Sequence, residues 1–172
     1  QSLAQLIMAI VNPGDEVIVP APYWVSYFQM IKMAEGTPIV IEALVDADFK
    51  VTAKQVEDAI SSKTKAFLFS TPCNPTGSVY SRNELNELVR VFEKHPNLII
   101  ISDEIYEHIN FIGEHVSIGQ FDSIKNLGLQ NNVALIPNGV KIYKKNELKL
   151  LPNPPWTNLI PKKSKILLYF GR

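Results

Sequence analysis

The sequence has few cysteines, little net charge and no long apolar run. One cysteine, Cys73, among 172 residues excludes an internal disulfide and a zinc site built on several cysteines. A lone thiol agrees with a reducing compartment, so we expect a cytoplasmic location. No apolar run reaches the roughly 18 residues that cross a bilayer, and the first residues lack the basic segment of a secretory signal. We therefore expect no association with a membrane.

The balance of 17 basic against 17 acidic residues conceals an uneven distribution along the chain. Residues 1–140 carry 9 Lys and Arg against 16 Asp and Glu, whereas residues 141–172 carry 8 against 1. The C-terminal stretch is also rich in proline, which excludes a continuous helix or a central strand there. We therefore treat residues 126–172 as a basic, proline-rich segment apart from residues 1–125.

The sequence also gives no indication of a nucleotide site or of a metal site built on histidines. Neither a G-x-G-x-x-G loop nor a P-loop follows any apolar run, which argues against dinucleotide and P-loop nucleotide sites. The three histidines, His95, His108 and His115, lack the i, i+4 spacing that brings two ligands onto one helix face. We expect no metal site from them.

What the sequence does contain is a regular alternation of apolar runs and amphipathic segments. Short apolar runs predict strands at residues 17–19, 38–41, 66–69 and 98–101. Helical spacing of apolar residues predicts helices at residues 3–11, 24–34, 52–60 and 81–92. Capping-box pairs, Thr52 with Gln55 and Ser81 with Glu84, mark the start of the last two helices. This alternation predicts an α/β fold with a mainly parallel sheet and flanking helices.

In a parallel α/β sheet, ligands bind at the carboxyl ends of the strands. Three of the predicted strand ends are followed by unusual segments, namely Pro22-Tyr23-Trp24-Val25-Ser26-Tyr27, Asn74-Pro75-Thr76-Gly77 and Ser102-Asp103-Glu104-Ile105-Tyr106. Indole, amide, carboxylate and phenol groups should therefore meet at one edge. Each segment also has a structural alternative: packing in a core or interface for Trp24, a turn at Asn74, and a helix N-cap for Asp103.

Together these groups suit a flat heteroaromatic cofactor that has a basic ring nitrogen and a phenolic oxygen. A carboxylate keeps the ring nitrogen protonated, an amide and a phenol form hydrogen bonds to the ring oxygen, and an indole covers the ring face. Pyridoxal 5′-phosphate is a cofactor with these properties.

Residues 1–125 resemble the large domain of the fold-type I pyridoxal-phosphate enzymes, and in particular the class I aminotransferases of the bacterial aspartate type. The segment Asn12-Pro13-Gly14-Asp15-Glu16-Val17 matches the family, as do the three segments that follow the predicted strands. The resemblance implies that Trp24 stacks on the ring, that Asn74 and Tyr106 bond its oxygen, and that Asp103 pairs with its nitrogen. It also implies transamination between an amino acid, with aspartate favoured, and a 2-oxo acid, in an enzyme that is a homodimer when complete.

Residues 126–172 depart from the family pattern. Asn138-Gly139-Val140-Lys141 resembles the segment that holds the Schiff-base lysine, which makes Lys141 the candidate for that residue, but the serine before the lysine is absent. The alternative is that Lys141 belongs to a solvated basic stretch. We expect the chain to be incomplete and its last residues to be out of frame or joined from elsewhere, and we expect no nucleic-acid binding. A catalytically inactive fragment and a lyase of the same fold are the alternative functions.

Overall fold

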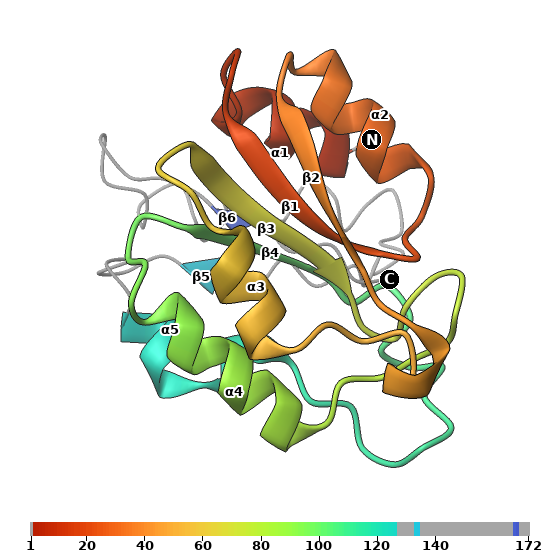
Figure 1. Ribbon diagram of the computed structural model, residues 1–172. Helices are drawn as coiled ribbons and strands as arrows, with labels where there is room; N and C mark the ends of the chain where they lie inside the picture. The colour runs from red at the N-terminus through yellow and green to blue at the C-terminus, as the bar shows by residue number, and fades with distance from the viewer. Residues whose placement is uncertain (1, 127–132, 135–166, 169–172) are drawn as a thin grey trace, which may run out of the picture.

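A four-stranded parallel sheet forms the centre of the molecule within the part of the chain that the structure describes (Figure 1). The structure is a computed structural model, and it describes residues 2–126, 133–134 and 167–168. The strands are β1 (Glu16–Ala21), β2 (Thr37–Glu42), β3 (Thr64–Ser70) and β4 (Ile99–Asp103). Their order in the sheet is β2-β1-β3-β4, and every neighbouring pair is parallel. This arrangement confirms the predicted α/β fold.

Helices cover both faces of the sheet, as Figure 1 shows. They are α1 (Ser2–Ile10), α2 (Ser26–Met33), α3 (Ala53–Ala59) and α4 (Arg82–Phe92). Successive strand residues point to opposite faces, so Val17 and Val19 pack with α1 and α2, whereas Ile18 packs with α3 and α4. Two separate apolar clusters result, one on each face, and both bury central strand residues completely. This two-sided burial explains why the strands are apolar without alternation.

The two predicted capping boxes are present. The Thr52 hydroxyl accepts a hydrogen bond from the Gln55 N–H, and the Thr52 N–H donates to the Gln55 side chain at 2.9 Å. Ser81 and Glu84 make the same reciprocal pair at the start of α4. Both pairs satisfy backbone N–H groups that have no partner inside the helix, so these helices begin where the sequence predicts.

Strand β4 is less buried than its apolar composition indicates. Residues 98–101 form the most apolar run of the chain, yet among the β4 residues only Ile101 is fully buried. The reason is its position, because β4 is an outer strand of the sheet that the structure describes.

Several short elements are present that periodicity does not predict. They are the 3₁₀ helices η1 (Val45–Ala47) and η2 (Ile118–Gln120), the helix α5 (Asp122–Asn126), and the strands β5 (Val133–Ala134) and β6 (Leu167–Leu168), which pair in parallel. Each is too short for an apolar period to be recognised in sequence. Among the helices that the structure describes, none has both the length and the apolar character needed to span a membrane.

Candidate active site

The four predicted ring-binding residues lie at the carboxyl ends of β1, β3 and β4 or in the segments that directly follow them. Trp24 lies between β1 and α2, Asn74 in the turn after β3, Asp103 at the last position of β4, and Tyr106 in the turn that follows β4. Strands β3 and β4 end side by side, because Ser70 is the register partner of Asp103. The prediction that these segments gather at one edge of the sheet is therefore confirmed.

Asn74 and Tyr106 lie next to each other although 32 residues separate them in the chain. The Asn74 amide nitrogen is 3.4 Å from the Tyr106 hydroxyl. Asn74 is held by a tight turn in which the Gly77 N–H donates to the Cys73 carbonyl at 2.7 Å, and Gly77 has a φ of +74°. The turn proposed as the structural alternative for this segment is present, and it leaves the Asn74 amide directed toward Tyr106.

Asp103 has one hydrogen-bond donor on each carboxylate oxygen. The Tyr27 hydroxyl donates to Oδ2 at 2.6 Å, and the Ile105 N–H donates to Oδ1 at 3.2 Å. Residues 105–108 form a turn and not a helix, so the helix N-cap alternative for Asp103 is wrong. Burial raises the pKa of Asp103 above its ordinary value, the two hydrogen bonds oppose this increase, and the neighbouring Glu104 adds to it.

Trp24 contacts Tyr27, the residue that donates to this carboxylate. It exposes 40% of its surface, so it is not part of the buried core. Its ring meets the Tyr27 ring edge-on, with the ring centres 5.7 Å apart and the planes at 88°. An indole that is supported on one edge and accessible to solvent can stack on a planar ligand.

An open pocket of about 390 Å³ lies beside Asn74 and Tyr106. Pro72, Cys73, Ile109 and Phe111 contribute to its lining, so the wall is mostly apolar with few polar groups. This composition is typical of small-molecule sites. Asp103 and Trp24 do not line this pocket. The site residues thus form two neighbouring groups, one of Asn74 with Tyr106 and one of Asp103 with Tyr27 and Trp24.

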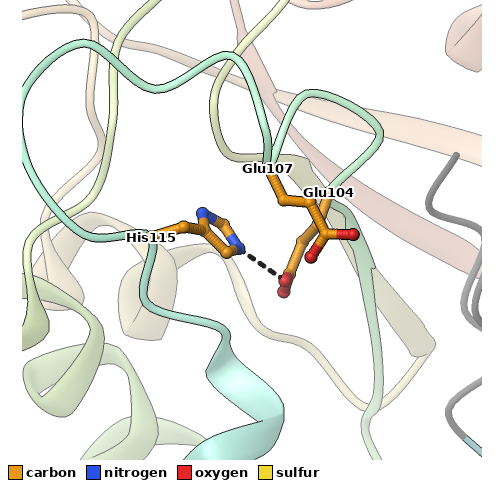
Figure 2. Close-up of side chains that lie close together, drawn as sticks. All are labelled: Glu104, Glu107 and His115. Atoms are coloured by element: carbon orange, nitrogen blue, oxygen red, sulfur yellow. Dashed lines mark hydrogen bonds and ion pairs between the residues drawn. The ribbon is translucent and has the colours of Figure 1, made fainter.

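Glu104 takes part in a different group, which Figure 2 shows. Its carboxylate oxygen Oε2 is 2.7 Å from the His115 Nε2, and the other oxygen accepts hydrogen bonds from Ser102 and Ser117 at 2.8 and 3.0 Å. Glu107 lies close enough that three ligand atoms, one each from Glu104, Glu107 and His115, could surround a metal ion. Because Glu104 is buried and already has these polar neighbours, we assign the group a structural role: it attaches the segment after β4 to that strand.

The sequence did not predict Tyr27 as a partner of the site, nor the separate structural group around Glu104. Tyr27 belongs to the same segment as Trp24, residues 22–27, but its partner Asp103 is 76 residues away in the chain. No local spacing connects residues that far apart. Lys141, the candidate for the Schiff-base lysine, lies outside the residues that the structure describes.

Known proteins match the greater part of the chain. The family described as "Aminotransferase class I and II" matches residues 1–135. An aspartate/prephenate aminotransferase of Cereibacter sphaeroides is 50% identical over 111 residues, which are 64% of this chain and 28% of that protein. An aspartate aminotransferase of Bacillus sp. strain YM-2 is 48% identical over 119 residues, which are 69% of this chain and 30% of that protein.

Solved structures agree with these matches. The aspartate aminotransferase from Rhizobium meliloti aligns with a TM-score of 0.70 and 36% identity, covering 72% of this chain and 32% of that one. The enzyme from Thermus thermophilus with maleate aligns with a TM-score of 0.66 and 44% identity, covering 69% of this chain and 31% of that one. The chain thus spans less than a third of the curated relatives described above. From its strand-end motifs, its fold and these matches, the chain belongs to the class I and II aminotransferases, a family of pyridoxal-phosphate enzymes.

Proposed function

We propose that residues 1–125 are part of the cofactor-binding large domain of an aminotransferase. The complete protein would transfer an amino group between an amino acid, with aspartate favoured, and a 2-oxo acid. Aspartate is favoured because three relatives that are 44–50% identical have names that include aspartate aminotransferase or aspartate/prephenate aminotransferase. When bound, pyridoxal phosphate supplies an electron sink that stabilises negative charge at the substrate α-carbon.

The observation that carries the proposal is the fixed carboxylate of Asp103 at the end of β4. An ionised carboxylate is the acceptor that a protonated ring nitrogen requires, and donors on both of its oxygens hold it in one orientation. Nearby, Asn74 offers an N–H and Tyr106 an O–H for a ring oxygen, and their polar atoms are 3.4 Å apart. Trp24 offers an exposed ring. This set of donors, acceptor and ring fits the cofactor.

Each side chain then has a role toward the ring. Trp24 would cover its face, Asn74 and Tyr106 would bind its oxygen, and Asp103 would keep its nitrogen protonated. Lys141 remains the candidate for the lysine that bonds to the cofactor and moves the proton. We propose a homodimer for the complete enzyme, as its family implies, and a cytoplasmic location, from the single cysteine.

The test is cofactor binding by the purified chain. Titration with pyridoxal phosphate should give a saturable change in absorbance and tryptophan fluorescence. Asp103→Asn should weaken the affinity about tenfold, because it removes the charge that pairs with the ring nitrogen. Asp58→Asn, which changes an exposed carboxylate on α3, is the matched control and should bind as the unaltered chain does. Absence of saturable binding, or equal binding by both variants, would contradict the proposal.

The chemistry of the bound state is tested separately. Borohydride reduction followed by peptide mass spectrometry should give one stoichiometric pyridoxyl adduct, at Lys141, that weakens in Asp103→Asn. Saturable binding with scattered or absent labelling would instead support the inactive fragment. Incubation with aspartate and 2-oxoglutarate should yield glutamate if the chain is active, whereas a lyase would release a fragment of the amino acid without needing the 2-oxo acid.

A further inference from the structure

Tyr27 is a buried residue that connects the apolar core to the candidate site. It lies in the first turn of α2, exposes 1% of its surface, and packs in the cluster that also contains Leu6, Ile31 and Leu68. Its hydroxyl points out of this cluster to the Asp103 carboxylate at 2.6 Å. A ring held on all sides by α1, α2 and the sheet is a donor whose position is already determined before any ligand binds.

The same ring also supports Trp24. Its edge-on contact with the indole means that one side chain touches both the carboxylate and the stacking residue of the candidate site. The two contacts arise from opposite properties of tyrosine, an apolar ring and a polar tip.

The charges around this contact determine which residue holds the proton. Burial raises the pKa of Tyr27 well above its ordinary value, and the negative charge of Asp103 raises it further, so the tyrosine stays protonated and donates. Three other side chains act on the pair. The charge of Glu104 disfavours ionisation of Asp103, Cys73 disfavours ionisation of Tyr27, and a hydrogen bond with the Ser70 side chain favours ionisation of Tyr27 without outweighing burial and Asp103. Of the groups that favour the Asp103 carboxylate, Tyr27 is the side-chain donor and Ile105 the backbone donor.

We propose that Tyr27 is a positioning residue that holds the Asp103 carboxylate ionised and oriented toward the cofactor ring nitrogen while its ring supports the stacking indole of Trp24. The role toward the ring rests on the proposed function. The effect on Asp103 does not, because the contact exists without a ligand.

The test compares two buried tyrosines in the full chain. Tyr27→Phe removes the hydroxyl at Asp103 and keeps the packed ring. Tyr80→Phe removes the hydroxyl of another buried tyrosine, which accepts a hydrogen bond from the Val51 N–H at 3.0 Å. The second variant thus controls for the loss of one buried hydrogen bond.

The first readout needs no cofactor. Carbon-13 NMR of labelled aspartate side chains, assigned with Asp103→Asn, follows the titration of Asp103. Tyr27→Phe should raise the pKa of Asp103, because it removes a donor that favours the charged form, and Tyr80→Phe should leave it unchanged. An unchanged titration in Tyr27→Phe would overturn the inference, whatever the cofactor result.

The second readout is the affinity for pyridoxal phosphate as a function of pH. Tyr27→Phe should bind about tenfold more weakly at neutral pH, and the deficit should increase as the pH falls toward the titration of Asp103 in the variant. A deficit of equal size in Tyr80→Phe would overturn the positioning role. If the unaltered chain fails to bind the cofactor while Tyr27→Phe still raises the pKa of Asp103, the proposed function fails and the effect of Tyr27 on Asp103 stands.

Discussion

Asp103 and Glu104 are adjacent acidic residues, but their carboxylates bond different partners. Asp103 ends β4 and bonds Tyr27 of α2, whereas Glu104 bonds Ser102, Ser117 and His115. Asp103 is the last residue of β4 and Glu104 directly follows it, and the two side chains bond different partners, so one acidic pair serves two groups. Asp103 belongs to the candidate site, and Glu104 stabilises the segment that carries Tyr106.

Removal of the Glu104 side chain should cost much of the stability. Glu104→Ala leaves two serine hydroxyls and His115 without their acceptor in a buried place, so we expect the free energy of unfolding to fall by about 3 kcal/mol. Urea denaturation followed by circular dichroism measures it. Glu107→Ala, which truncates a more accessible carboxylate of the same group, should cost less than about 0.5 kcal/mol. A cost below about 0.5 kcal/mol for Glu104→Ala would contradict the structural role of Glu104.

At the scale of elements, the packing of α2 on the sheet determines where Tyr27 lies. The helix packs on the sheet through Tyr27 and Ile31, and its C-terminal turn closes with the Gly36 N–H donating to the Ile31 carbonyl at 3.0 Å. Gly36 lies close to Val11, the residue that follows α1, since a Cβ atom at position 36 would lie 2.6 Å from a Val11 methyl group and 3.1 Å from an Ile31 methyl group. A larger residue at position 36 would therefore force the buried Val11 side chain to move.

Gly36→Ala should destabilise the chain by about 1–3 kcal/mol, the usual cost of inserting a methyl group where no space exists. Thermal unfolding should show a lower midpoint. Gly119→Ala is the matched control, because its new methyl group would meet only the Ser117 hydroxyl, at 3.5 Å, and should change the midpoint little. The packing argument would be wrong if both variants unfolded at the same temperature.

At the scale of the whole molecule, apolar side chains are exposed beside the candidate site. Ile109, Phe111 and Ile112 follow the Tyr106 turn, and Phe111 exposes 93% of its surface. Ile109, Phe111 and Ile112 also line the open pocket next to Asn74. A contiguous exposed apolar group of this kind favours association with another surface.

We therefore expect the chain to self-associate through residues 109–112. Sedimentation velocity should show an average mass that rises with concentration, and the double variant Phe111→Ser with Ile112→Ser should reduce this rise. Met33→Ser removes an exposed apolar side chain from α2, away from the pocket, and should leave the association unchanged. A monodisperse monomer at all concentrations would contradict the expectation.

Sequence patterns alone determined the α/β class and the order along the chain of the four main strands and four main helices. They also identified the strand ends that carry Trp24, Asn74, Asp103 and Tyr106. These features depend on periodicity, capping and turn chemistry, which act over a few residues. Only the tertiary structure determined which side chains bond each other. Tyr27 bonds Asp103, Asn74 lies beside Tyr106, and His115 bonds Glu104. Those contacts join residues 11 to 76 positions apart, and they form only when the sheet brings its strand ends together.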